Sequence, residues 1–364
     1  MKITDVETIV LEKQLPAPIA NSKDARARYR TAIVRVRTDE GYFGLGEAFT
    51  DAGAVAGVVN GLKPRIVGLD PFAIELVWHR CFHGLARYDA HGLPVAVLSA
   101  IDMALWDLKG KVLQVPVYEL LGGRIRDRVK AYASDLHWQE DPTAMAREAA
   151  RFVEQGFKIV KTHVGRDPED DIRRVRALRE AIGPATGLMV DINTAYDRPT
   201  AIQFGRRIVD LDVFWYEEPL PPFDLAGHRL VRENTGLLIA TGENEYTKYG
   251  FKSLFEANAV DYAMPDVARC GGLTETKKIC ALAQAHNITV SPHNYSSGVC
   301  LAATLHLMMS TPGTELLEYD TADASISREF FLEPPEVKDG YVSLPETPGL
   351  GVILSDALIE KYGV

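Results

Sequence analysis

The chain has 364 residues, of which 46% are hydrophobic and 25% are charged, with 29 Gly and 20 Pro. These values are typical of folded proteins and exclude disorder, collagen and coiled coil as the main structure. The 50 acidic residues outnumber the 40 basic ones, which gives a formal net charge of −10. Because no basic patch stands out, we expect no nucleic-acid partner. An anionic substrate would need local positive charge.

The cysteine spacing and the N-terminus indicate an intracellular enzyme. Cys81, Cys270, Cys280 and Cys300 are scattered without a CxxC pair, which predicts reduced thiols and a cytoplasmic location. The opening segment MKITDVETIV carries acids within its first apolar run, so it does not resemble a signal peptide, and no run of 18 apolar residues predicts a membrane span. At this length we expect one large domain and one smaller domain.

The first third of the chain predicts an α+β unit. Residues 31–46 alternate apolar and polar side chains around a turn at 38–41, which is typical of a β-hairpin. Residues 50–113 show helical periodicity, and the last helix is expected to end at Gly110. Strands therefore come first and helices follow.

From about residue 128 the pattern changes to short apolar runs that alternate with amphipathic stretches. Buried parallel strands read as apolar runs and covering helices as amphipathic stretches, so this alternation predicts a parallel sheet covered by helices. Eight runs favour a (β/α) barrel over an open doubly wound sheet, and no glycine-rich dinucleotide fingerprint follows any run. The runs are 129–133, 157–164, 188–193, 213–217, 238–243, 260–264, 288–293 and 315–319.

The predicted architecture is α/β: a modified (β/α)7β TIM-type barrel with an α+β capping domain. We assign residues 1–125 to the cap and residues 126–322 to the barrel. Residues 323–364 lose the repeat and are rich in Pro and Gly. We expect this C-terminal segment to return to the cap.

Polar residues end the apolar runs, and in a (β/α) barrel the strand ends carry the chemistry. Asp191, Glu217 and Glu243 end three consecutive runs at equal intervals of 26 residues. Three such acids would lie side by side and repel one another unless a cation lay between them. Oxygen ligands without clustered Cys or His favour a hard divalent ion, Mg²⁺ before Mn²⁺. Glu218 competes with Glu217, because alternate residues of a strand point to opposite faces.

Two histidines are candidates for proton transfer. Lys161 and His163 lie two residues apart on the second run, so both can face the barrel interior. A lysine beside the imidazole would keep His163 neutral, the state that a proton acceptor needs. His293 ends the seventh run and Asp266 the sixth. An aspartate that holds one imidazole nitrogen fixes the tautomer and makes His293 a second acid/base group.

A set of motifs spreads over nearly the whole chain: SAIDMALWDLKGK followed by PVYELLGG, KTH on the second run, the Asp/Glu/Glu series, GEN, MPD, SPH, the glutamate of the eighth run and PGLG. With these motifs the chain resembles the enolase superfamily, mandelate racemase subgroup. The resemblance implies that Asp191, Glu217 and Glu243 bind Mg²⁺. It also implies that His293, supported by Asp266, is a general acid/base group.

The same resemblance implies roles around the substrate carboxylate. Glu318 would donate a hydrogen bond to it, Asn193 would contact the α-hydroxyl group, and Lys161 would be a nearby cation. Many subgroup members have Lys-x-Lys where this chain has Lys161-Thr-His163, so either Lys161 or His163 would move a proton. The implied chemistry is Mg²⁺-assisted removal of the proton α to a carboxylate, with an ene-diolate intermediate.

Several outcomes are compatible with this intermediate. We expect an acid-sugar dehydratase that converts an aldonate or aldarate to a 2-keto-3-deoxy acid, because a histidine acid suits hydroxide departure and the polar loop at 22–30 suits a polyol. Arg26 and Tyr29 of this loop are candidate substrate contacts. Racemisation, epimerisation and lactone cycloisomerisation are alternatives with the same site, and a catalytically silent barrel would have lost a ligand. The resemblance also implies a homo-oligomer and a small-molecule carboxylate as the partner.

Overall fold

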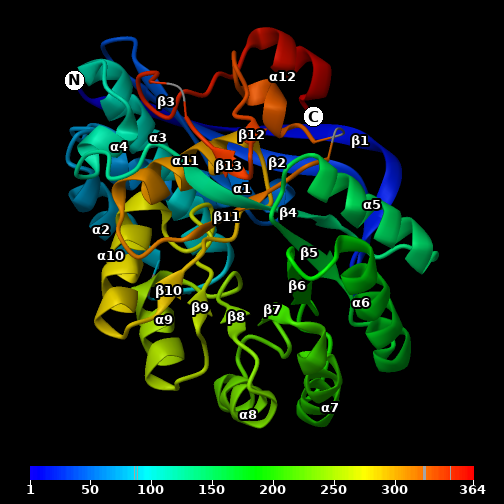
Figure 1. Cartoon of the computed structure of the whole chain (residues 1–364). Helices are drawn as coiled ribbons and strands as arrows, with labels where there is room; N and C mark the ends of the chain where they lie inside the picture. The colour runs from blue at the N-terminus through cyan, green and yellow to red at the C-terminus, as the bar shows by residue number, and fades with distance from the viewer. Residues whose placement is uncertain (86, 88, 323–324, 345) are drawn as a thin grey trace.

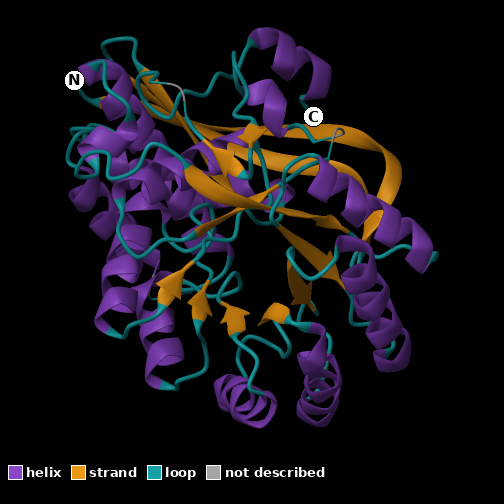
Figure 2. Ribbon diagram, in the orientation of Figure 1, coloured by secondary structure: helices purple, strands orange, loops and turns teal. Residues whose placement is uncertain are grey.

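The computed structural model describes residues 1–85, 87, 89–322, 325–344 and 346–364 and begins with a three-stranded antiparallel sheet in the order β1-β2-β3. Four helices follow this sheet in the described part of the chain. Sheet and helices together form the cap, at the upper left of the molecule (Figures 1 and 2). The strands are β1 (Ile3–Ala20), β2 (Ala25–Thr38) and β3 (Phe43–Ala48). The helices are α1 (Ala52–Ile66), α2 (Ile74–Leu85), α3 (Leu93–Leu113) and α4 (Val117–Leu120).

The predicted hairpin is confirmed, since Arg37 of β2 pairs with Phe43 of β3. The predicted loop at 22–30 was wrong in its extent. Strand β2 already begins at Ala25, because its first residues pair with the long strand β1, as between Arg28 and Gln14. The connecting turn is therefore short, and Arg26 and Tyr29 are strand residues.

Helix α3 packs directly against strand β3. A Cβ atom at Gly46 would lie 1.9 Å from the carbonyl oxygen of Ala100, and one at Gly44 equally close to that of Ala104. Only glycine allows the helix to approach the strand so closely. The helix continues three residues past the predicted end at Gly110 and stops before Gln114, which has a left-handed φ of 58°. An αL residue is a common helix end.

In the described residues after the cap, eight parallel strands alternate with seven helices. The strands are β4 (Val129–Leu136), β5 (Ile159–His163), β6 (Gly187–Asp191), β7 (Val213–Glu217), β8 (Ile239–Thr241), β9 (Tyr262–Ala263), β10 (Thr289–Val290) and β11 (Leu316–Tyr319). The helices are α5 (Pro142–Glu154), α6 (Pro168–Ile182), α7 (Arg198–Ile208), α8 (Leu225–Thr235), α9 (Thr247–Glu256), α10 (Gly272–Ala285) and α11 (Gly298–Ser310), with a 3₁₀ turn at Val209–Leu211.

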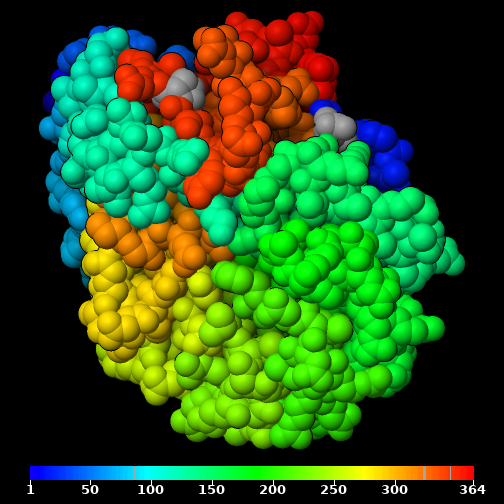
Figure 3. Space-filling view, in the orientation of Figure 1, coloured from blue at the N-terminus to red at the C-terminus, as the bar shows by residue number. Residues whose placement is uncertain are grey.

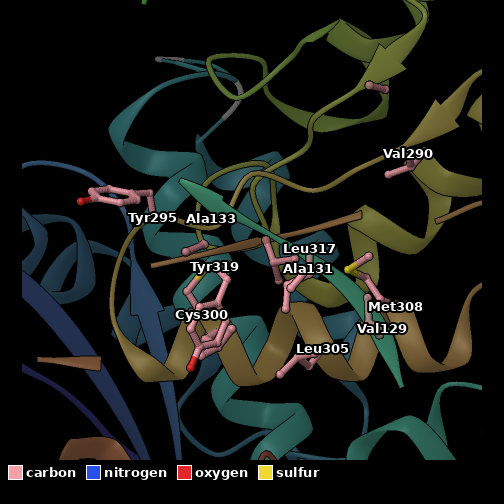
Figure 4. Packing of buried hydrophobic residues seen from close by; sticks show 14 of the residues in the cluster. Val129, Ala131, Ala133, Val290, Tyr295, Cys300, Leu305, Met308, Leu317 and Tyr319 are labelled. Atoms are coloured by element: carbon pink, nitrogen blue, oxygen red, sulfur yellow. The ribbon is translucent and has the colours of Figure 1, made fainter. Parts of the chain in front are cut away.

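The strands stand in chain order, and the last of them, β11, pairs in parallel with the first, β4. On the side of β10, the pairing consists of one parallel bridge between Val290 of β10 and Thr314, which lies just before β11. All eight runs predicted from the sequence contain a strand of this sheet, so the barrel-type architecture is confirmed. Figure 4 shows how its outer face is covered: Val129 and Ala131 of β4 lie beside Leu317 of β11, above Leu305 of α11.

The C-terminal segment contacts both parts of the molecule. Its short strands β12 (Val337–Lys338) and β13 (Tyr341–Val342) form a hairpin, and β13 pairs with β4 of the barrel. Its last helix, α12 (Asp356–Tyr362), leads to a bridge between Gly363 and Leu11 of the cap. Figure 3 shows this orange and red segment between the cyan and the green parts of the chain. A 3₁₀ turn covers Ser327–Phe330, and the predicted boundary at 323 falls outside the described residues.

Buried carboxylates of the cap accept hydrogen bonds from the first turns of two barrel helices. Glu47 of β3 accepts hydrogen bonds from the backbone N–H and hydroxyl group of Ser297 and from the N–H of Cys300, at the start of α11. Asp102 of α3 accepts from the N–H of Thr274 in the first turn of α10. The cap thus satisfies the free N–H groups of two barrel helices.

Within the described ranges, no helix is long and apolar enough to cross a membrane. All four cysteines are buried, and each is a free thiol.

Candidate active site

A pocket of about 210 Å³ lies between the β1–β2 turn and the carboxyl ends of the barrel strands. The residues predicted for the site line this pocket, except Asp266, Glu217 and Tyr29. Many of the lining residues are charged, and they come both from the cap and from several strands of the barrel.

The inward face of each strand is marked by a small apolar cluster that fills the barrel interior. Ile159, Met189, Trp215 and Leu316 belong to it, one from each of four strands. Because alternate residues of a strand share a face, the residues two positions further along also point inward. These residues are Lys161, Asp191, Glu217 and Glu318, so the polar floor of the pocket lies directly above the apolar interior.

Lys161 lies among the carboxylates of this floor. Its Nζ is 2.5 Å from Glu217 Oε1, 2.7 Å from Glu318 Oε1 and 3.7 Å from Asp191 Oδ2, and the side chain is only 1% exposed. Burial alone would lower the pKa of Lys161, but the carboxylates of Glu217 and Glu318 raise it well above its ordinary value. The carboxylates beside Lys161 therefore favour its charged form.

Lys161 lowers the pKa of His163, as predicted, but the nearby Asp191 outweighs this effect. The imidazole Nδ1 lies 3.2 Å from Asp191 Oδ2 and 3.1 Å from Asn193 Oδ1, and Nε2 lies 3.1 Å from the carbonyl oxygen of Ser134. Burial lowers the pKa of His163, but the hydrogen bond to Asp191 more than compensates, so the pKa is raised. Oxygen atoms that can accept a hydrogen bond therefore lie beside both ring nitrogens.

Asp191, Glu217 and Glu243 offer oxygen atoms from three neighbouring strands. Burial raises the pKa of Glu217 well above its ordinary value, and the negative charges of Asp191, Glu318 and Glu243 oppose its ionisation further, against the effect of Lys161. A divalent cation would relieve this accumulated charge, so the donor set fits a hard metal ion. Among the described residues, no three acidic, His or Cys side chains already enclose an ion-sized space.

Glu218 points away from this floor. It has a positive φ of 42°, and its carboxylate accepts hydrogen bonds from the hydroxyl group of Thr241, the N–H of Gly242 and the side chain of Asn244. Burial and the nearby Glu243 raise its pKa to about 7. Glu217, by contrast, faces the interior with Trp215, whose indole N–H donates to it at 2.8 Å.

His293 and Asp266 form the predicted pair on the other side of the pocket. Nδ1 of His293 lies 2.5 Å from Asp266 Oδ2, and Nε2 faces Glu243 Oε2 at 3.6 Å and Glu318 Oε2 at 3.8 Å. Burial lowers the pKa of His293, but Glu243 and Glu318 raise it to about 10. The ring of Phe49, at the end of the cap sheet, stacks on the imidazole with centroids 5.5 Å apart, so the cap fixes its orientation.

Glu318 does not match the donor role that the resemblance implies. Its Oε1 accepts hydrogen bonds from Lys161 and from the hydroxyl group of Ser134, and its Oε2 accepts from the N–H of Asn294 at 2.9 Å. Burial would raise its pKa, but the charges of Lys161 and His293 hold it far below the ordinary value. In this arrangement Glu318 is an ionised acceptor, and a donor role would require Lys161 to move away.

Of the two predicted cap contacts, only Arg26 lies in the pocket. Tyr29 is 4% exposed, and its hydroxyl group donates to Asp320 Oδ2 at 2.9 Å. The prediction of Tyr29 as a substrate contact was therefore wrong, because its side chain packs beneath Arg26 rather than facing the pocket. Asn193 lies in the pocket as predicted, where its amide nitrogen donates to Asp191 at 2.8 Å.

His137 and Tyr295 line the pocket but were not predicted. Nε2 of His137 lies 2.9 Å from the hydroxyl group of Tyr295, which in turn donates to Asp135 at 3.0 Å. Because the tyrosine proton goes to Asp135, the His137 nitrogen is the donor and its Nδ1 has a free lone pair when the ring is neutral. Burial lowers the pKa of His137 and favours this neutral form. A signal was available, since Asp135 and His137 are polar residues that follow the first apolar run, 129–133, as the predicted site residues follow or end theirs.

Comparison with known proteins agrees with this geometry. The N-terminal domain model of mandelate racemase and muconate lactonizing enzyme matches residues 5–122, and the enolase C-terminal domain-like model matches residues 144–358.

The chain belongs to the enolase superfamily, mandelate racemase subgroup.

Curated relatives in this subgroup include both dehydratases and cycloisomerases. The D-galactarolactone cycloisomerase of Agrobacterium fabrum is 34% identical and matches over 99% of this chain and 98% of its own length. The D-xylonate dehydratase of Haloferax volcanii is 32% identical over 100% of this chain and 89% of its own length. A likeness of this degree leaves the choice between the two reaction classes open.

Solved structures of the superfamily have the same fold along the whole chain. The 3,6-anhydro-D-galactonate cycloisomerase from Zobellia galactanivorans is 35% identical, with a TM-score of 0.92 and full coverage of both chains. A racemase from Streptomyces coelicolor A3(2), solved with bound magnesium, is 32% identical, also with a TM-score of 0.92 and full coverage of both chains.

Proposed function

We propose that this protein is an Mg²⁺-dependent acid-sugar dehydratase that removes the proton α to the substrate carboxylate. The observation that carries the proposal is the pocket floor, where acids from adjacent strands and the buried Lys161 face the His293–Asp266 pair across one small space. Relatives that are named dehydratases of sugar acids support the substrate class.

We assign the metal to Asp191, Glu217 and Glu243. When bound, Mg²⁺ supplies positive charge where negative charge accumulates on the substrate carboxylate during proton removal. The buried ammonium group of Lys161 contributes a second positive charge at the same place. Asn193 is assigned to the α-hydroxyl group, because it lines the pocket beside Asp191.

His293 is the acid/base group of this proposal. Asp266 holds its Nδ1, so Nε2 is the nitrogen that accepts the α-proton. The same Nε2–H then protonates the β-hydroxyl group, which leaves as water, and the resulting enol becomes a 2-keto-3-deoxy acid. Because Glu243 is the largest of the charges that raise the pKa of His293, neutralising Glu243 favours the unprotonated ring that proton removal requires.

A second candidate is lactone cycloisomerisation. It is favoured by the cycloisomerases from Agrobacterium fabrum and Zobellia galactanivorans, both of which match along the full chain. The same proton removal would then expel a ring oxygen or a lactone oxygen from the β-carbon instead of hydroxide. Simple epimerisation needs proton delivery to the opposite face, where His163 is held between acceptors.

A panel of acid sugars and their lactones, incubated with Mg²⁺ in deuterated water, tests the proposal. Dehydration gives a keto acid that reacts with semicarbazide. Cycloisomerisation consumes a lactone and leaves an open or rearranged acid, and epimerisation gives deuterium at C2 without a keto acid. Absence of both α-proton exchange and product across the panel would refute the proposed function.

A further inference from the structure

Arg26 is an isolated cation in the wall of the pocket. It comes from the start of β2 and is half-buried, with its guanidinium carbon 4.9 Å from the ring centroid of Tyr29 and 5.0 Å from that of Tyr295. Aromatic faces attract a guanidinium group and restrict its movement. The two rings are themselves fixed, because their hydroxyl groups donate to Asp320 and Asp135. The guanidinium group is therefore held in place before any ligand arrives.

This cation has no carboxylate partner in the part of the chain that the structure describes. Its neighbours are the side chains of Tyr29 and Tyr295, and Asp320 attracts it only from beyond ion-pair distance. Lys161, the other cation of the pocket, is paired with Glu217 and Glu318. Asp24 also lines the pocket, but it is exposed and forms no ion pair with Arg26.

We propose that Arg26 binds a second anionic group of the substrate, so that the enzyme acts on sugar acids that carry negative charge at both ends. This inference rests on the proposed function, which assigns the reacting carboxylate to the floor near Lys161. A guanidinium group donates two parallel hydrogen bonds to a carboxylate or a phosphate. The second group is therefore the distal carboxylate of an aldarate or the phosphate of a phosphorylated aldonate.

The size of the pocket fits such a substrate. Its volume of about 210 Å³ equals that of roughly seven water molecules in the liquid. This space suits one compact open-chain acid.

The test compares three matched substrates of one configuration: an aldonate, the corresponding aldarate and the 6-phosphoaldonate. The wild type is expected to show a kcat/KM at least tenfold higher for one of the two doubly charged acids than for the aldonate. Arg26→Gln should lower kcat/KM for that acid at least tenfold more than for the aldonate, because a charged hydrogen-bond pair is lost. Arg26→Lys should restore part of the preference.

Arg28→Gln is the matched control. Arg28 lies on the same strand, is exposed and pairs with Glu12 outside the pocket, so its loss removes the same charge without touching the site. The Arg28→Gln variant should keep the wild-type preference. Equal losses for singly and doubly charged acids in Arg26→Gln, or an unchanged preference, would overturn the proposal.

Binding without turnover separates this proposal from the proposed function. In the presence of a chelator, the aldarate or the 6-phosphoaldonate should raise the Tm of the wild type and of Arg28→Gln more than the aldonate does, and Arg26→Gln should lack this difference. If this shift occurs while no acid is turned over, the anion site stands and the proposed reaction fails. If turnover occurs and neither the shift nor the kinetic preference depends on Arg26, the reaction stands and the anion site fails.

Discussion

At the scale of single residues, the charges of the pocket floor depend on which neighbours meet in space. The ammonium group of Lys161 contacts the carboxylates of Glu217 in β7 and Glu318 in β11, and the carboxylate of Asp191 contacts the imidazole of His163. Each of these pairs joins different strands. In each of these pairs the partner that influences the protonation state lies at least 28 positions away in the chain.

The inward position of Glu217 leads to a prediction about metal affinity. Glu217→Gln should weaken Mg²⁺ binding at least tenfold, because one of three anionic ligands is lost. Glu218→Gln should leave the affinity within about threefold of the wild type, since Glu218 is bonded to Thr241, Gly242 and Asn244 outside the floor. Isothermal titration of both variants with Mg²⁺ provides the measurement. The reverse order would assign the metal to Glu218.

The His293–Asp266 pair leads to a second prediction at this scale. His293→Asn should lower kcat by about 10³-fold or more, because the acid/base group is lost, while Mg²⁺ binding persists through the three carboxylates. Steady-state turnover and α-proton exchange in deuterated water measure the first effect, and metal titration measures the second. Retention of exchange at the wild-type rate would remove His293 from the proton-transfer step.

At the scale of elements, the cap is joined to the barrel through buried acids at helix starts. Asp102 of α3 accepts a hydrogen bond from the first turn of α10, but its Oδ1 is buried without a partner among the described residues. Burial raises its pKa to about 7. An acid placed in this way stabilises the contact between α3 and α10 best when it is protonated.

This arrangement predicts a pH-dependent stability. The folded protein holds the Asp102 proton up to about pH 7, whereas the unfolded chain loses it near pH 4. Stability therefore falls as the pH rises through this window, by roughly 4 kcal/mol at most from this group. Asp102→Asn lacks the effect, so its unfolding free energy relative to wild type should increase between pH 4 and pH 7. Urea denaturation at several pH values measures it, and a constant difference would contradict the assignment.

At the scale of the whole molecule, the net charge of −10 describes the surface rather than the pocket. The three proposed ligands carry three negative charges, which Lys161 and a divalent ion would balance. At the cap wall the substrate also meets the positive charge of Arg26. The cap is essential to this balance because it supplies Arg26 and the ring of Phe49 over His293.

Metal removal gives a prediction for the whole molecule. Mg²⁺ should raise the Tm of the wild type, because a ligand that binds only the folded state adds stability, about 2.7 kcal/mol at 100 times Kd. A chelator should reverse the shift, and Glu217→Gln should show a smaller one at the same Mg²⁺ concentration. Thermal scans with sodium chloride at equal ionic strength are the control. An equal shift with sodium chloride would mean that the effect is ionic screening.

Much of this architecture follows from local patterns. The alternation of apolar runs and amphipathic stretches was enough to predict the eight strands, and the polar residues at their ends predicted most of the pocket lining. Prediction from the sequence fails where one pattern is compatible with two structures. Both faces of a barrel strand are buried, so alternation alone does not say whether Glu217 or Glu218 faces inward, and a polar stretch such as 22–30 reads as a loop although it pairs with β1.

The sequence by itself determined the fold class, the order of the strands and the positions of the acids, because these depend on periodicities within short segments. Only the tertiary structure decided which charges are paired. It showed Lys161 and Glu318 as an ion pair, His163 between two acceptors, Tyr29 buried and Arg26 without an ion-pair partner among the described residues. These properties depend on distances between strands and on burial, and Coulomb interactions in a low-dielectric interior make such distances decisive.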